Sequence, residues 1–310
     1  MTGRRAAPVS RSMFPVRGSM RRSFIRYPLL FIAPAFVIYL VFFVIPNITG
    51  MYYSFTDLST YSDKVSFIGF ENFARLIREG FLVTAIRNTF IYAVCVTVFV
   101  NILGMTLALL LNEAPVLGNV YRTAFFTPYV IAPLIVGYLF TAIYQPEVGI
   151  LNRALRSLGL GALAADWLND PRIALYSIIM TELWRSSGFA MVIYLAGLKT
   201  IPRDLLDQAN VDGAGYMTRF RRITFPLLAP SFTVTVLLML INSLKVFETV
   251  LVLTNGGPGW VTEVFNTFIY RNFARGNWGY ATSASLTLSI VIAVVAVVFL
   301  RLLRRREVEV

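Results

Sequence analysis

Six long apolar stretches restrict what this 310-residue chain can fold into more than any other feature of its sequence. Each has about 20 mostly apolar residues, the length of helix needed to cross a bilayer core of about 30 Å. Hydrophobic residues make up 57% of the chain and charged residues 14%, whereas soluble domains average about 45–50% and about 25%. We therefore predict an all-α, polytopic membrane protein with six transmembrane helices, near residues 27–45, 89–111, 124–144, 173–198, 228–253 and 282–303. The first is expected to end at Pro46-Asn47.

The distribution of charge predicts how these spans are oriented. The formal net charge is +12, which in a soluble chain would indicate nucleic acid as a partner. Here the two ends of the chain and the loops after the second and fourth spans hold 17 basic and 6 acidic residues, whereas the other three loops hold 9 and 8. Because Lys and Arg are retained on the cytoplasmic side, we expect both termini to be cytoplasmic, with membrane lipid and no nucleic acid beside the basic residues.

The same reasoning divides the chain into domains. We predict a basic cytoplasmic tail at residues 1–26, a six-helix transmembrane domain at 27–306 and a short tail at 307–310. The amino-terminal tail is rich in arginine and free of acid, which also fits a mitochondrial transit peptide.

Several kinds of chemistry are excluded by residues that the sequence lacks. Cys95 is the single cysteine and there is no histidine, which excludes a disulfide scaffold and a Ser-His or Cys-His catalytic pair and argues against a zinc site. The sequence contains no G-x-x-x-x-G-K-[ST] phosphate-binding loop. We therefore expect no catalytic residue, metal or cofactor in this chain, and an ATPase on another chain if transport uses ATP.

The loop after the fourth span is expected to contain two short helices. The first helix begins at Pro202, which suits a first turn, and is stopped by Gly213 and Gly215, which can adopt positive φ. The second begins near Tyr216 and ends at Pro226. A loop that only joins two spans needs no helices, so this one is a candidate for coupling. The alternative is a linker that lies on the lipid headgroups, with Arg219, Arg221 and Arg222 in contact with them.

This loop resembles the signature loop of the permease subunits of bacterial ABC importers. The core of that loop is Glu-Ala-Ala, three residues, Gly, nine residues and Ile-x-Leu-Pro, and it is matched here by Asp207-Gln208-Ala209, Gly213 and Ile223-Thr224-Phe225-Pro226. This chain differs at Asp207, Gln208 and Phe225. Residues 67–73, 195–198 and 254–259 resemble segments of the carbohydrate-uptake, maltose-permease-like branch, and the resemblance covers about residues 27–306.

The resemblance implies a type I ABC-importer permease fold in a bacterial cytoplasmic membrane. It implies a second homologous permease, two ATPase subunits that bind ATP and Mg²⁺, and an extracytoplasmic solute-binding protein or lipoprotein that delivers a sugar-class solute. In such permeases the first helix of the signature loop docks into a cleft of the ATPase. The residues that this assigns to ATPase coupling, within a loop at 199–226, are Asp207, Gln208, Ala209, Asp212, Gly213, Ala214 and Arg219.

Charged residues inside the predicted spans are candidates for function, because their burial in lipid is costly. Glu182 and Arg185 are three residues apart, as are Lys245 and Glu248, so each pair can also neutralise itself on one helix. The resemblance implies that the solute is held by one face of the fourth span and one of the fifth. Those faces carry Glu182, Arg185, Ser186, Phe189, Met239, Asn242, Ser243 and Val246. Ordinary helix packing is the alternative for Met239 and Val246, and close helix approach for Ser186 and Gly188.

The remaining loops and functions are weighed on the same sequence. Residues 67–78 in the outer loop predict a turn and a short amphipathic helix, for which packing on the membrane surface is an alternative.

A secondary transporter driven by an ion gradient is an alternative function, since Glu182 and Glu248 are buried acids. A secondary transporter would not need the helical signature loop, and no inverted repeat is evident in the sequence. A membrane scaffold without transport leaves the polar residues inside the spans unexplained.

Overall fold

The computed structural model describes residues 32–62, 64–78, 80–113 and 118–304. The chain divides into two compact units, Met1–Thr49 and Gly50–Val310. The basic residues of the predicted amino-terminal tail, and Arg305, Arg306, Glu307 and Glu309 near the other end, lie outside the described residues. The described residues are helical and contain one isolated antiparallel bridge, between Thr56 and Phe67.

The first unit contains α1 (Ala33–Tyr39), a π-helical turn (Leu40–Val44) and the beginning of α2 (Ile45–Tyr53). The expectation that this helix ends at Pro46 is wrong, since it continues to Tyr53. The N–H of Ile45 bonds to Leu40 O, five residues back. The backbone hydrogen bonds of the helix are therefore shifted by one residue directly before Pro46. For this reason the helix accommodates the missing N–H and the ring of Pro46 without ending.

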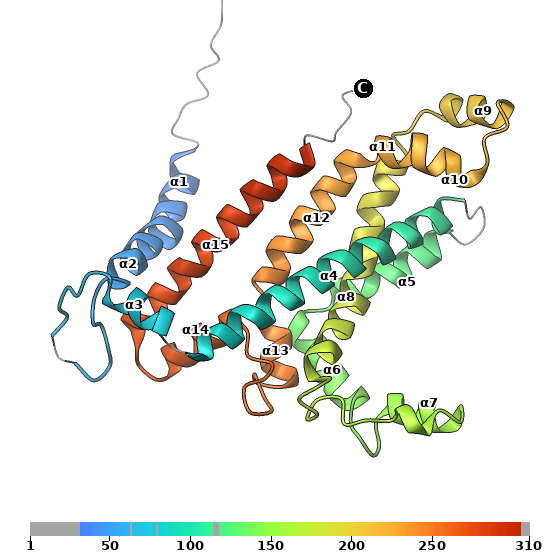
Figure 1. The fold of residues 1–310 in the computed structure, drawn as a ribbon. Helices are drawn as coiled ribbons and strands as arrows, with labels where there is room; N and C mark the ends of the chain where they lie inside the picture. Colours follow the sequence, from blue (N-terminus) through green and yellow to red (C-terminus); the bar gives the residue numbers. More distant parts are fainter. Residues whose placement is uncertain (1–31, 63, 79, 114–117, 305–310) are drawn as a thin grey trace, which may run out of the picture. The chain divides into compact units, whose positions relative to one another are not determined.

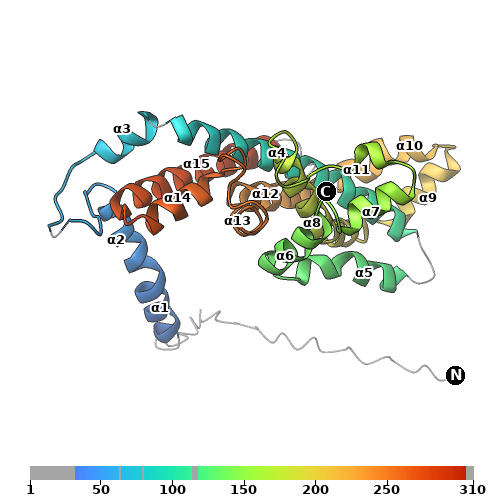
Figure 2. The same cartoon turned by 90° about the horizontal axis from the view of Figure 1, so that it is seen from below.

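The second unit is an array of helices packed around α4 and α8 (Figures 1 and 2). In Figure 1, α9 and α10 lie at its upper end and α7 and α13 at its lower end, while Figure 2 shows α14 and α15 on one side of α12 and α5 and α6 on the other. Its helices are α3 (Glu71–Arg78), α4 (Gly80–Asn112), α5 (Gly118–Val130), α6 (Pro133–Ile143), α7 (Ile150–Ser157), α8 (Ala174–Leu198), α9 (Arg203–Val211), α10 (Tyr216–Arg219), α11 (Phe225–Leu227), α12 (Ala229–Leu244), α13 (Glu248–Leu253), α14 (Phe265–Ala274) and α15 (Trp278–Arg304), with a 3-10 turn at Gly161–Leu163 and a π-helical turn at Phe220–Thr224.

Two apolar clusters hold this unit together. One joins α4, α8, α12 and α13 and includes Tyr92, Met191 and Met239. The other joins α3, α4, α12, α14 and α15 and includes Leu244 and Phe268. Apolar side chains also cover the outer surface of α15, where Val294 is 56% exposed. Exposed apolar surface on a long helix is what a lipid-facing span requires.

The helices bend sharply at two places, one within the predicted third span and one where the coupling loop meets the predicted fifth span. Helices α5 and α6 meet at an angle of 97°, and residues 216–227 meet α12 at 69°. Among the described residues, three helical runs are long and apolar enough to cross a membrane, or up to five if each bent pair counts as one span. The three runs are Ala33–Tyr53, Leu82–Asn112 and Trp278–Arg304. Helix α8, with its charged turn, is not among these runs, so the count of six spans stays a prediction.

Candidate functional site

A polar turn in the middle of α8 is the first part of the candidate site. Arg185 forms two hydrogen bonds with Glu182, at 2.7 Å from Nη2 to Oε1 and 3.1 Å from Nε to Oε2. Ser186 Oγ also donates to Glu182 Oε1. The Glu182 residue is 8% exposed, and a buried carboxylate is stable only when its charge and its lone pairs are satisfied. The predicted self-neutralising pair is therefore present.

Aromatic rings on α5 and α8 pack beside this turn. The Arg185 guanidinium lies over the Tyr129 ring, with Cζ 5.1 Å from its centroid. The other neighbour of Tyr129 is Phe189, whose ring stacks on it with 4.3 Å between centroids. Helices α5 and α8 can approach this closely because residue 188 is glycine. A β-carbon at this position would collide with the backbone of Phe125. The alternative reading of Gly188 as a residue of close helix approach is confirmed.

The second part of the site is a break in the predicted fifth span. Helix α12 ends at Leu244 and α13 begins at Glu248, and no ion pair joins Lys245 to Glu248 among the described residues. The alternative in which these two residues neutralise each other on one helix is therefore wrong, because the helix that would align them is interrupted. The Asn266 amide donates to Lys245 O at 2.8 Å.

These two parts border one cavity of about 330 Å³. It is lined by Tyr92, Tyr129, Pro133, Glu182, Arg185, Asn242, Ser243, Lys245, Val246, Phe247, Glu248 and Thr249. The structure thus brings together five of the eight residues assigned to the solute path. Ser186, Phe189 and Met239 do not line the cavity, because Ser186 faces Glu182, Phe189 stacks on Tyr129 and Met239 is 2% exposed in the apolar core.

Of the lining residues that the sequence did not identify, Tyr92 lies within α4, and three others lie at or beside helix breaks. Tyr129 and Pro133 flank the bend between α5 and α6, and Phe247 lies in the break before α13. Pro133 was the available signal, since a proline inside an apolar stretch marks a probable kink. Breaks in membrane helices are tolerated where they line a cavity, and they often carry the solute site of a transporter.

The predicted coupling loop forms a compact pair of helices. Gly213 has φ +74° and ends α9, with Gly213 N bonded to Asn210 O at 3.0 Å and Ala214 N to Ala209 O at 2.9 Å. These two bonds define a Schellman motif. Gly215 has φ −66°, so its expected positive φ is wrong. Pro226 does not end the second helix either, which continues to Leu227 after the π-helical turn at Phe220–Thr224.

Inside this loop, the predicted coupling residues divide into buried and exposed ones. Ala209 is 7% exposed, so it packs against its own chain and not on an outer surface. Arg219 bonds to Asn210 Oδ1 and ties α10 to α9. Asp207, Gln208 and Asp212 are exposed. The same loop exposes four apolar side chains that the sequence did not identify, Leu205, Val211, Tyr216 and Met217, which are 40–88% exposed.

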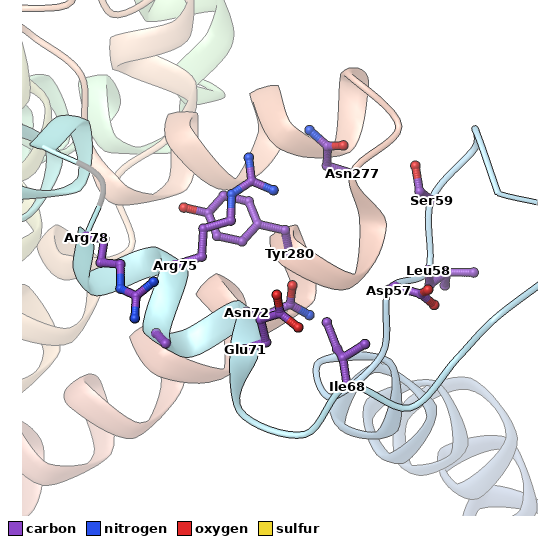
Figure 3. A pocket seen from close by; sticks show the side chains of 11 residues that line it. Asp57, Leu58, Ser59, Ile68, Glu71, Asn72, Arg75, Arg78, Asn277 and Tyr280 are labelled. Carbon is purple, nitrogen blue, oxygen red and sulfur yellow. The ribbon is translucent and has the colours of Figure 1, made fainter.

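At the opposite end, α3 and the loop before it form an ordered platform. As predicted, residues 67–70 make a turn before the helix. Asn72 Nδ2 bonds to Ser54 O at 3.0 Å and Thr56 O at 2.8 Å. The platform borders a cavity of about 820 Å³. Figure 3 shows Arg75 beside the Tyr280 ring in this cavity, with 4.4 Å from Cζ to the ring centroid.

The Gly-Gly-Pro loop after α13 lies at the same end. Arg271 on α14 fixes it, with Nη2 2.9 Å from Glu263 Oε2 and 3.1 Å from Asn255 O, and with Cζ 3.6 Å from the centroid of the Trp260 ring. Burial raises the pKa of the Glu263 carboxyl, and Arg271 offsets part of that rise. Among the described residues, no cluster of three Asp, Glu, Cys or His side chains is placed to hold a metal ion.

A polar cavity between broken apolar helices, together with a helical loop at one end, defines a solute permease of a membrane. Residues 101–308 match the model of the family of inner membrane components of binding-protein-dependent transport systems, and the chain belongs to this family. The chain is therefore a permease subunit of an ABC importer.

Individual relatives cover nearly the whole chain. It is 34% identical over 281 residues to the probable starch degradation products transport system permease protein AmyD of Thermoanaerobacterium thermosulfurigenes, across 90% of this chain and 94% of that one. It is 30% identical to the trehalose/maltose transport system permease protein MalF of Thermococcus litoralis, with the same coverage. A crystal structure of a bacterial alginate ABC transporter, in complex with an alginate pentasaccharide-bound periplasmic protein, contains a similar chain, with a TM-score of 0.78, 26% identity and coverage of 89% and 93%.

Proposed function

We propose that this permease and a second homologous permease together form the membrane path of an importer for a sugar or sugar-like solute. The observation that carries the proposal is the cavity at the two helix breaks. Asn242 and Ser243 offer hydrogen-bonding groups for hydroxyls, and Tyr129 offers an aromatic ring in place of Phe189. Relatives named for starch products and for trehalose and maltose support a carbohydrate as the solute.

Uptake measurements on reconstituted transporter test this proposal. Asn242→Ala removes one hydrogen-bonding side chain from the cavity, which is worth about 0.5–1.5 kcal/mol. We therefore expect the apparent KM for a transported sugar to rise about twofold to twelvefold. The matched control is Asn169→Ala, which removes an exposed amide far along the chain and outside the cavity. An unchanged KM in both Asn242→Ala and Tyr129→Ala would contradict the assignment.

For coupling, we propose that the loop at 199–226 docks onto separate ATPase subunits that bind ATP and Mg²⁺. The exposed acids Asp207 and Asp212 support this role, as does the apolar side chain of Val211, which is 88% exposed. Val211→Glu is expected to abolish recovery of the ATPase subunit with the purified permease. Leu158→Glu makes the same change at a residue that is 73% exposed beside α7, and should not affect recovery. Equal recovery from the two variants refutes the docking surface.

At the other end, we propose that an extracytoplasmic solute-binding protein docks on the platform around α3. The alginate transporter in complex with a periplasmic protein supports a binding protein as a partner, and the cavity of about 820 Å³ beside α3 supports the platform as its site. A bulky maleimide attached to Asp57→Cys, in a Cys95→Ser background, is expected to suppress stimulation of ATP hydrolysis by the binding protein. The same reagent on the background alone is the control, and stimulation that persists after complete labelling argues against docking here.

We propose a location in the bacterial cytoplasmic membrane, with six spans and cytoplasmic termini. The excess of basic residues on one set of segments supports the orientation. It predicts that an impermeant thiol reagent labels Asp57→Cys but not Asp212→Cys in intact cells. The reverse pattern would require the opposite orientation.

A further inference from the structure

The break between α12 and α13 is supported by one side chain from another helix. Residues 245–247 lie outside both helices; Phe247 O accepts the N–H of Leu251 in α13, whereas the carbonyl groups of Lys245 and Val246 have no partner within α12 or α13. Asn266 Nδ2 lies 2.8 Å from Lys245 O and 3.5 Å from Val246 O. A single amide therefore serves two successive carbonyls at the point where the span is interrupted.

Asn266 is itself held in place by α4. Asn88, which is 5% exposed, donates to Val261 O at 2.7 Å and Glu263 O at 2.9 Å. The backbone N–H of Phe265, the first residue of α14, donates to Thr89 Oγ1 at 2.9 Å. The beginning of α14 is thus bonded to a long helix of the core, and Asn266 is the next residue.

The segment that Asn266 contacts begins with Lys245 and is followed directly by Glu248, the first residue of α13. Both charged residues line the cavity together with Glu182 and Arg185. We propose that Asn266 is a positioning residue, which keeps residues 245–247 unwound and thereby sets where Lys245 and Glu248 lie in the solute path. The inference rests on the proposed function of the cavity, but its geometry is tested without any solute.

The test measures how fast a charged methanethiosulfonate reagent labels a cysteine at either side of the break. Because Cys95 is the single cysteine, a Cys95→Ser background makes each reporter unique. Glu248→Cys reports the segment after the break, and Asn242→Cys reports α12 before it. The labelling is measured in membrane vesicles with the assembled transporter, for Asn266→Ala and for Asn266→Asp, which keeps the size of the side chain but loses the donor. Recovery of assembled protein is measured for each variant.

We expect both Asn266 variants to change the labelling rate of Glu248→Cys about threefold to tenfold, as the loss of one or two hydrogen bonds implies. The rate for Asn242→Cys should change by less than about twofold, and Asn266→Gln should recover much of the parental rate at Glu248→Cys. Asn272→Ala is the matched control, since its amide bonds to Phe268 O within the same helix.

Equal labelling of Glu248→Cys in the parent and in both Asn266 variants overturns the proposal, as does an equal change with Asn272→Ala. A panel of sugars that includes maltose and trehalose then separates this inference from the proposed function. If Asn266 controls labelling but no sugar slows it, the positioning role holds and the assignment of the solute fails.

Discussion

Gly188 on α8 offers a severe test of the packing that builds the cavity. A β-carbon at this residue would lie 1.8 Å from Phe125 O, 2.5 Å from Phe125 C and 3.0 Å from Phe126 Cα. Carbon and oxygen atoms of neighbouring groups normally stay about 3.3–3.6 Å apart. Gly188→Ala therefore forces α5 away from α8 by roughly 1.5 Å at this contact.

The obstacle is backbone, which gives a cost at the upper end of the usual range for overpacking, about 3 kcal/mol. Alanine returns about 0.5–1 kcal/mol through its higher helix propensity, which leaves a net destabilisation of about 2 kcal/mol. The entropy of unfolding is about 2.1 cal/mol/K per residue, so in a chain of 310 residues each kcal/mol lowers Tm by about 1.5 °C. We expect Gly188→Ala to melt about 3 °C below the parent in detergent.

Gly50→Ala is the matched control, because a β-carbon there meets no atom within 4 Å. It should leave Tm unchanged or raise it slightly. Displacement of α5 also carries Tyr129 away from Arg185, so the apparent affinity for solute should fall in Gly188→Ala and not in Gly50→Ala. A Tm for Gly188→Ala at or above that of the parent would refute the close approach of the two helices.

Three further predictions concern charge and backbone conformation. Glu182→Gln leaves the half-buried Arg185 without its partner, which costs at most about 3 kcal/mol; Tm should fall, and the double variant Glu182→Gln/Arg185→Met should recover most of the loss. The pKa of Glu263 is raised in the folded protein, so the folded state binds more protons and stability falls as pH rises from about 4.5 through the raised pKa. Tm measured against pH should show this fall in the parent and lose it in Glu263→Gln. Gly213→Ala places a side chain at φ +74°, which costs about 1–2 kcal/mol; it should reduce co-purification of the ATPase, and unchanged recovery would contradict the role of the α9 cap.

The long helices could be predicted from sequence because their length and apolar composition are local properties. The predicted span at 173–198 corresponds to α8 at Ala174–Leu198, with its polar turn paired as expected. Both errors at prolines have one cause. A π-helical turn ends two residues before Pro46, and another ends two residues before Pro226. The order of residue types does not reveal such a shift in backbone hydrogen bonding, so the continuation of both helices could not be predicted from the sequence.

The cavity was only half predictable for a different reason. The family resemblance, with helical spacing, assigned Glu182, Arg185, Asn242 and Ser243 to single faces of the fourth and fifth spans, and these four residues line the cavity. Tyr129 comes from α5, and its position depends on the approach at Gly188, which is a contact between helices. The same limit explains the error at Lys245, whose helix is interrupted beside Asn266 on α14.

The pairing of Glu182 with Arg185 has an electrical consequence. Moving one unpaired elementary charge through the membrane potential costs about 2.3 kcal/mol per 100 mV. Here the two opposite charges lie on one turn of one helix, 2.7 Å apart, so any movement of α8 carries both of them through the field together. Their contributions cancel, so this pair adds almost no voltage dependence to a movement of α8.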